Sequence, residues 1–179
     1  LLQRVGNILL KNDEPGFSKF LLASDAMGMV ASDMRPAAEQ AVALLRQSLG
    51  ELEPMNLYQG REKEWMEAFR TLQGTEIWQT HGEWIRDTRP VFGPQIQARF
   101  DWAASIDPGG VPAAHKVRSD VTRILDDLLG KDRVICLPTS PSIALPRNLA
   151  DNQLGQFRMD ALSLLCVAGL ASLPQVSLP

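Results

Sequence analysis

The sequence predicts an α/β protein that is mostly helical and contains two or more short core strands. Three observations support this prediction. Amphipathic helical patterns fill most of the 179 residues, two short apolar runs stop at Leu-Pro steps, and a largely apolar helix separates those runs. Two apolar strands with a crossover helix between them are the elements of a parallel βαβ unit. Parallel strands are buried on both faces, so the sheet needs further strands that these two runs do not supply.

The N-terminal segment is expected to lead into a helix. Residues 1–10, LLQRVGNILL, are interpreted as an extended or looping lead-in. Residues 17–30 are predicted to form a helix, because their apolar side chains lie near helical spacing.

A second helix is predicted over 32–50. Asp33 can cap its first turn, Pro36 is tolerated there, and Gly50 suits its end. The following residues, 51–58, are interpreted as a short strand or a linker.

The middle of the chain is predicted to be helical. Residues 61–86 form either one long helix or two helices broken at Gly74 and Gly82. A further helix covers 94–106, with Pro94 in its first turn.

A breaker and a clear amphipathic helix follow. The sequence DPGGVP at 107–112 interrupts the chain. Residues 113–130 carry an apolar stripe along one helical face and end at Gly130, which favours a C-terminal cap.

The last part of the chain is predicted to alternate strand, loop, helix and strand. The apolar run 133–137 is a strand that Pro138 ends, because proline cannot donate a ladder hydrogen bond. A proline-rich loop continues to residue 148, a buried helix covers 157–168, and 175–178 are predicted to form a second strand.

Composition excludes several classes of protein. The chain is 45% hydrophobic and 22% charged with a net charge of −3, which argues against a basic surface for nucleic acid or anionic membrane. No stretch approaches the ~20 apolar residues of a membrane span. Cys136 and Cys166 lie in apolar runs and are interpreted as buried, reduced thiols, with a disulfide or a catalytic thiol as the alternatives. This cysteine usage favours a cytoplasmic location.

The usual catalytic and ligand-binding motifs are absent from the sequence. It has no glycine-rich phosphate loop and no G-x-S-x-G nucleophile motif. His81 and His115 have no second ligand at metal-binding spacing, so no metal and no cofactor are expected. Asp126 and Asp127 are adjacent on a helix and are expected to belong to a solvated face.

Five residues are candidates for a binding pocket. Thr139, Ser140 and Pro141 follow the carboxyl end of a predicted strand, where open α/β sheets bind ligands; an ordinary proline-rich connection is the alternative. Trp78 and His81 lie on an aromatic helical face, where His81 is interpreted as a packed, hydrogen-bonded core-edge residue or as a pocket residue.

Four blocks of the sequence, in this order and spacing, resemble the C-terminal half of the amidase signature enzymes. They are FRTLQGTEIWQTHGEWI, RPVFGPQIQARFDWAASI, VRSDVTRILDDLLGKDRVICLPTSPSIALP and FRMDALSLLCVAGLASLPQVSLP. The pattern is closest to the plant-type amidases and their bacterial relatives, some of which act on indole-3-acetamide. LLASDAMGMV is similar to the family segment that joins the catalytic core to the C-terminal helices.

This resemblance implies a mixed, mainly parallel sheet covered by helices, and hydrolysis of the carbon–nitrogen bond of small linear amides. The family uses a serine nucleophile, a second serine on a cis peptide and a lysine. No Gly-Ser-rich stretch is present here, and no lysine has the catalytic context, so no catalytic residue is assigned to this chain. Residues 1–179 are therefore expected to be one segment of a larger amidase domain, incomplete at both ends and inactive alone.

The resemblance also implies roles for the candidate pocket. CLPTSP matches the strand-end loop that borders the substrate cleft, so Thr139, Ser140 and Pro141 are expected to form a pocket wall. Trp78 and His81 are expected to shape an acyl pocket for an aromatic substrate. The expected partner is a small amide, with no nucleic acid and no membrane, and the family includes homodimers.

Two other functions remain open within this resemblance. One is the amidotransferase subunit that produces ammonia for tRNA-bound glutamate. The other is a non-catalytic interaction module, because some plant import receptors contain a degenerate amidase-like domain.

Overall fold

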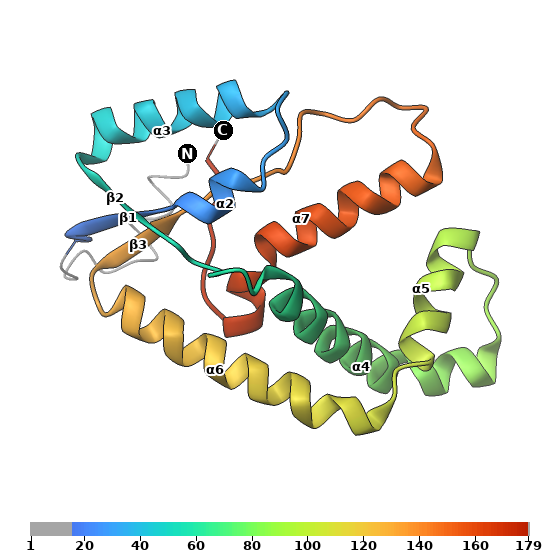
Figure 1. Ribbon diagram of the computed structural model, residues 1–179. Helices are drawn as coiled ribbons and strands as arrows, with labels where there is room; N and C mark the ends of the chain where they lie inside the picture. Colours follow the sequence, from blue (N-terminus) through green and yellow to red (C-terminus); the bar gives the residue numbers. More distant parts are fainter. Residues whose placement is uncertain (1–15, 179) are drawn as a thin grey trace, which may run out of the picture.

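A three-stranded parallel sheet with helices on both sides lies at one end of the molecule (Figure 1). The computed structural model describes residues 16–178. Its elements in chain order are β1 (Lys19–Ala23), α2 (Ser24–Gly28), α3 (Arg35–Leu49), β2 (Leu52–Met55), α4 (Glu62–Thr88), α5 (Pro94–Ala104), the 3-10 turn η1 (Pro108–Gly110), α6 (Val111–Leu129), β3 (Arg133–Cys136) and α7 (Asp151–Ala171). The prediction of a mostly helical α/β fold is confirmed.

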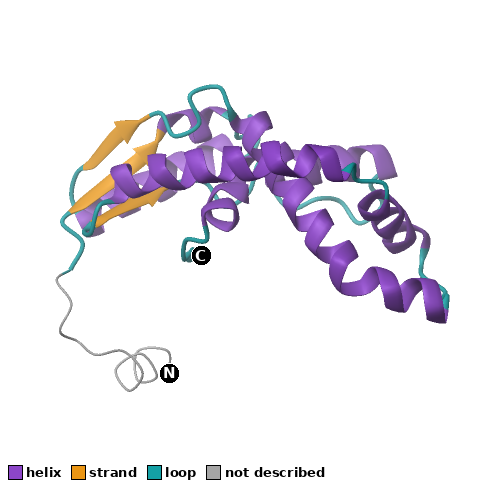
Figure 2. Cartoon of the chain, turned by 90° about the horizontal axis from the view of Figure 1, so that it is seen from below, coloured by secondary structure: helices purple, strands orange, loops and turns teal. Residues whose placement is uncertain are grey.

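The strand order is β2-β1-β3, and both pairs are parallel. In the register of the sheet, Leu22 of β1 is opposite Pro54 of β2 and Cys136 of β3. The strands lie side by side at one end of the molecule, and the long helices extend away from them (Figure 2). The sheet therefore connects segments that are more than 100 residues apart in sequence.

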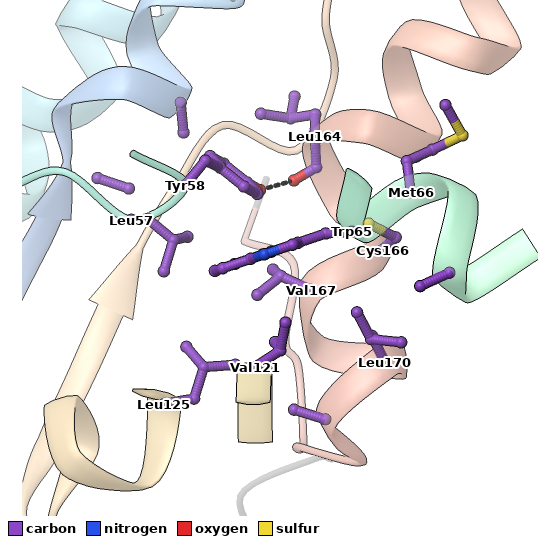
Figure 3. Close-up of a cluster of buried hydrophobic side chains, with 14 of the residues drawn as sticks. Leu57, Tyr58, Trp65, Met66, Val121, Leu125, Leu164, Cys166, Val167 and Leu170 are labelled. Atoms are coloured by element: carbon purple, nitrogen blue, oxygen red, sulfur yellow. Dashed lines mark hydrogen bonds between the residues drawn. The ribbon is translucent and has the colours of Figure 1, made fainter. Parts of the chain in front are cut away.

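The main core lies between the sheet and helices α4, α6 and α7 (Figure 3). Trp65 of α4 is 1% exposed and lies among side chains from the two other helices, including Val121, Leu125 and Val167. Fully burying one large apolar side chain contributes about 1.5–3 kcal/mol, so this three-helix cluster is the main source of stability in the described part of the chain.

Helix α4 continues through Gly74 and Gly82, so the one-helix alternative of the prediction holds. A Cβ atom on Gly74 would lie 2.8 Å from Trp102 Cη2 and would also meet Ile106. At Gly74, α5 and the segment that follows it therefore lie close against α4. Gly74 leaves room for the Trp102 ring and does not break the helix.

The prediction of a helix over 17–30 is wrong. Residues 19–23 form β1, and only the short helix α2 follows. An apolar run as short as KFLLA shows no periodicity, so its sequence does not distinguish a buried strand from a buried helix. The expected cap at Asp33 is also wrong, because α3 begins later and Met34 is its N-cap residue.

Other predicted boundaries agree with the structure. Pro36 lies in the first turn of α3 and Gly50 is its C-cap residue, while 51–58 contains β2. Pro94 begins α5, and Gly130 is the C-cap residue of α6. The last helix, α7, is longer at both ends than the predicted 157–168.

The predicted strand over 175–178 is wrong, although 133–137 does contain β3. Val176 and Leu178 are 80% and 66% exposed, and their backbone joins no ladder. Strand composition alone does not make a strand, because pairing and burial decide it. The parallel neighbour of β3 is β1, so the expected βαβ unit between the two Leu-Pro runs does not form. The prediction for residues 1–10 lies outside the described residues.

Helix α7 is long and apolar enough, by length and composition alone, to cross a membrane. Its most apolar window has a mean hydropathy of 1.3, and 28% of that window is buried. The statement that no stretch approaches a membrane span was therefore too strong. Its buried residues, such as Leu164 and Leu170, pack in the core with α4 and α6.

We expect Gly74→Ala to destabilise the fold, because its methyl group has no room against Trp102 and Ile106. Overpacking of this kind costs about 1–3 kcal/mol. The matched control is Gly155→Ala in α7, where a Cβ meets nothing within 4 Å. There we expect a gain of about 0.5–1 kcal/mol from higher helix propensity. Urea unfolding, followed by far-UV circular dichroism, measures the change in the free energy of unfolding for both variants. Equal effects of the two substitutions would contradict the close-approach role of Gly74.

Candidate functional site at the carboxyl edge of the sheet

The carboxyl ends of the three parallel strands meet at one edge of the sheet. The segments that leave this edge are α2 after β1, residues 56–61 after β2, and residues 137–150 after β3. Open α/β sheets bind ligands beyond the carboxyl ends of their strands. This edge is therefore the candidate site, and it contains three of the five predicted pocket residues.

Asp25 joins the first two of these segments. Its Oδ1 accepts hydrogen bonds from the backbone N–H of Ala26 at 3.0 Å and of Leu57 at 2.9 Å. Its Oδ2 accepts from the N–H of Tyr58 at 2.7 Å and of Gln59 at 3.1 Å. Hydrogen bonds to a carboxylate are stronger than neutral ones. The turn after β2, where Gln59 has a left-handed φ of 52°, is thus held by the residue that follows β1.

Tyr58 connects this turn to the main core. Its hydroxyl donates a hydrogen bond of 2.5 Å to the Leu164 carbonyl in α7, and its ring lies 5.4 Å from that of Trp65 (Figure 3). Burial raises the pKa of Tyr58 well above its usual range, and the nearby Cys166, Asp25 and Glu62 raise it further. Tyr58 therefore stays neutral and acts as a hydrogen-bond donor, not as a base.

The loop after β3 is attached to the same edge. The Pro141 carbonyl accepts a hydrogen bond of 2.8 Å from the Ala31 N–H, which lies between α2 and α3. Pro141 is buried, and Ser140 is half-buried with its hydroxyl donating to the Ser142 carbonyl at 2.7 Å. Thr139 is exposed. The structure thus places Thr139, Ser140 and Pro141 at the strand end, with Thr139 facing solvent.

Trp78 and His81 lie elsewhere, on the half of α4 that packs against α5. The Arg86 guanidinium lies 5.6 Å from the Trp78 ring centre, and the His81 ring meets Phe100 edge-on at 6.2 Å. His81 was predicted to be a packed, hydrogen-bonded core-edge residue; it is exposed and packs only edge-on against Phe100. The described residues do not bring this pair to the carboxyl edge of the sheet (Figure 1).

The remaining polar candidates lie on the surface. His115, Asp126 and Asp127 are exposed along one face of α6, which confirms the solvated-face interpretation of the aspartate pair. Arg99 is also exposed, on α5. Within residues 16–178, no three His, Cys, Asp or Glu side chains gather as a metal site would require.

Both cysteines are free thiols, and the prediction that they are buried holds for Cys166 but not for the half-buried Cys136. Cys166 is buried, and burial raises its pKa to about 12; burial also raises the pKa of the half-buried Cys136. The thiolate is the reactive form of cysteine, so neither thiol is suited to nucleophilic catalysis.

Asp25 and Tyr58 were not found by the sequence analysis. Asp25 lies two residues after an apolar run, at the place where a parallel strand delivers a polar side chain to the sheet edge. That signal was available, but the run was interpreted as a helix. Tyr58 gave no separate signal, because its partner in α7 is 106 residues away.

Comparisons with known proteins agree with this architecture. The chain is 36% identical to Amidase 1 of Arabidopsis thaliana over 114 residues, and 31% identical to Amidase 1 of Oryza sativa subsp. japonica over 113 residues. The chain is similar to plant amidases. These relatives support an amidase-type family. No protein-family model matches the chain.

The similarity to these two amidases covers 63% of this chain and only 26% of the length of each relative. A third relative is named Translocon at the outer membrane of chloroplasts 64, from Pisum sativum. It is 23% identical over 99% of this chain, which corresponds to 29% of its own length. A cytoplasmic location stays a prediction, because the name of this relative places that protein at an organelle membrane.

We expect Asp25→Asn to release the turn after β2. The amide keeps one acceptor oxygen and turns an N–H₂ group toward backbone donors, which costs about 2–3 kcal/mol for partly buried, charge-assisted bonds. Hydrogen exchange of the Leu57, Tyr58 and Gln59 amides should accelerate, and urea unfolding should report the loss. Asp33→Asn, at an exposed aspartate without a capping bond, is the control and should change neither. Unchanged amide protection in Asp25→Asn would contradict the role of the carboxylate.

The chain contains one tyrosine, so the ionisation of Tyr58 can be followed directly. A free tyrosine ionises near pH 10, and burial raises the pKa of Tyr58 in the folded state. The folded state is therefore fully stabilised by the neutral phenol below pH ~10, and this stability is lost as pH rises further. Tyrosinate absorbance near 295 nm should appear together with unfolding. Ionisation near pH 10 with the fold intact would contradict the burial.

Proposed function

We propose that the chain is the C-terminal part of an amidase that hydrolyses the carbon–nitrogen bond of a small linear amide, giving a carboxylate and ammonia. The observation that carries this proposal is the 36% identity to a plant protein named Amidase 1. An aryl-acetamide is the proposed substrate class. The signature family and the aromatic preference are part of the proposal and rest on the sequence blocks quoted above.

The catalytic groups are proposed to lie outside this chain. In the described residues, no serine, threonine or cysteine side chain makes a hydrogen bond with a lysine or histidine side chain, an arrangement that would activate a nucleophile. In the proposed reaction a serine hydroxyl adds to the amide carbonyl, its proton passes to the leaving nitrogen, and ammonia departs. Water then hydrolyses the acyl-enzyme. Residues 1–179 supply sheet, covering helices and part of the pocket wall.

The carboxyl edge is the proposed contribution of this chain to substrate binding. Thr139 is exposed there, and Ser140 and Pro141 hold the loop in place through the bonds to Ser142 and Ala31. Trp78 and His81 lie beside α5, so they line an acyl pocket only together with residues beyond the described part. The small-molecule partner is accordingly proposed to enter next to Thr139.

A non-catalytic interaction module is the second candidate. The observation in its favour is the relative from Pisum sativum, whose similarity extends over 99% of this chain rather than 63%. Its printed name describes a translocon component and not an enzyme. A polypeptide of this kind would keep the sheet and the carboxyl edge but lack the lysine and the Gly-Ser-Ser stretch upstream.

Ammonia release from an aryl-acetamide tests the enzyme against the module. We expect the complete polypeptide that contains this chain to release ammonia and the 179-residue chain to release none. A complete polypeptide that contains the lysine and serines but is inactive on a panel of linear amides would support the module. Hydrolysis by the 179-residue chain would contradict the assignment of the catalytic groups to other parts of the protein.

Thr139→Val tests the pocket wall within the same assay. The substitution keeps the side-chain shape and removes the hydroxyl, and a lost substrate hydrogen bond of about 1 kcal/mol gives a change in kcat/KM of about fivefold. Thr80→Val, on the exposed face of α4, is the matched control. Both variants should unfold within experimental error of the parent. Equal kcat/KM for the Thr139 variant and the control would exclude a substrate contact at this hydroxyl.

A further inference from the structure

The two outer strands of the sheet, β2 and β3, have different outer edges. The outer edge of a sheet presents backbone N–H and C=O groups that can pair with a further strand. In the described residues, β2 and β3 each pair with β1 and with no other strand. The residues on the two outer edges therefore indicate at which of them the sheet ends.

Pro54 determines which backbone groups of β2 point outward. It lies opposite Leu22 of β1, and proline has no N–H to donate to a ladder. The N–H and C=O of one strand residue point to the same side, and the side alternates along the strand. The ladder with β1 therefore uses the groups of Glu53 and Met55, and Pro54 lies on the outer edge. Glu53 and Pro54 are exposed, and charged residues and proline are typical of strands that end a sheet.

The same alternation determines the outward groups of β3. Leu21 precedes Leu22 on β1, so its groups point to the other side and pair with β3, at Val134 and Cys136. The N–H and C=O of the other two residues of β3, 133 and 135, therefore point away from β1. Within residues 16–178, no backbone hydrogen bond from another segment reaches this outer edge.

The side chains of β3 are those of an interior strand. Val134, Ile135 and Cys136 are apolar in succession, so both faces of the strand are apolar, as in parallel strands with a neighbour on each side. All four residues of β3 are nevertheless half-buried. Half-burial on both faces is expected of an apolar strand that has a neighbour on one side only. By its residues, β2 ends the sheet, whereas β3 lacks a neighbour.

The neighbour that these features favour is another strand of the same polypeptide. The aligned part of this chain covers only 26% of the length of each Amidase 1, so a polypeptide of that kind has further chain to supply a strand. A parallel strand beside β3 would pair with the outward groups of Arg133 and Ile135 and continue the existing parallel order. A second copy related by a two-fold axis would instead place β3 antiparallel to β3, unlike either pair in the sheet.

We propose that the sheet continues beyond β3 and not beyond β2, through a parallel strand from the part of the complete polypeptide outside this chain. This continuation rests on the proposed function, in which the chain is one part of a larger amidase domain. Parallel strands have their carboxyl ends at the same sheet edge, so the added strand ends beside the loop that contains Thr139. The segment after it then continues the pocket wall on the side of β3.

Hydrogen exchange of single amides in the complete polypeptide tests this arrangement. The Val134 and Cys136 amides bond to β1, whereas the Ile135 amide needs the added strand for protection. We expect the Ile135 amide to exchange at a rate similar to theirs, about a hundredfold slower than an unpaired amide. Mass spectrometry with fragmentation that assigns deuterium to single residues measures the three rates. Fast exchange at Ile135 beside slow exchange at Val134 and Cys136 would overturn the proposal.

Pro54→Ala is the matched control at the other edge. It adds an outward N–H to β2, where no further strand is proposed, and this amide should exchange about a hundredfold faster than that of Ile135. Slow exchange there would contradict the assignment of β2 as the end of the sheet. Protection of Ile135 that falls on dilution would assign the β3 edge to a second copy, and equal protection in the isolated 179-residue chain would assign it to this chain's own residues. Either result would overturn the proposal.

The exchange rates and the release of ammonia separate this proposal from the proposed function. A complete polypeptide that protects Ile135 but hydrolyses no amide would contradict the amidase and support the continued sheet. A polypeptide that releases ammonia while the Ile135 amide exchanges fast would support the amidase and contradict the added strand.

Discussion

The carboxylate of Asp25 is the interaction on which the arrangement of the sheet edge depends. It takes four backbone N–H donors, three of which come from residues 57–59 after β2. Once these amides are fixed, the Tyr58 ring enters the core and its hydroxyl reaches the Leu164 carbonyl of α7. Trp65 then packs against Tyr58 at the beginning of α4. One charged side chain thus links the end of β1, the turn after β2 and two core helices.

The parallel sheet imposes the second constraint, because both of its faces must be removed from water. On the core side, α4, α6 and α7 meet this demand with large apolar side chains. Gly74 brings α5 close to α4 by giving room to Trp102, and Gly169 of α7 faces Phe69 of α4 in the same way. On the other side α3 covers β1 and β2 only in part. All four residues of β3 are half-buried, on the core face as well as on the other.

The parts of this fold that could be predicted from sequence are those governed by local chemistry. The stripe of 113–130 with its terminal Gly130, and the proline that begins α5, depend on neighbours within one or two turns. The assignments that failed depend on distant partners. KFLLA is a strand because β2 and β3 pair with it, and QVSL is not a strand because nothing pairs with it. The Leu-Pro step marks a strand end, and this signal identified Thr139, Ser140 and Pro141. Asp25 was not identified, because the strand before it was predicted to be a helix.

The relatives of this chain have names of two different kinds, an amidase and a chloroplast translocon component. The bonds of Asp25, Ser140 and Ala31 are satisfied within the chain, so the carboxyl edge keeps its shape without any catalytic group. Similarity to proteins named Amidase 1 and to a translocon component is then expected for the same segment. Thr139 is exposed at this edge, whereas Ser140 and Pro141 hold the loop through hydrogen bonds within the chain.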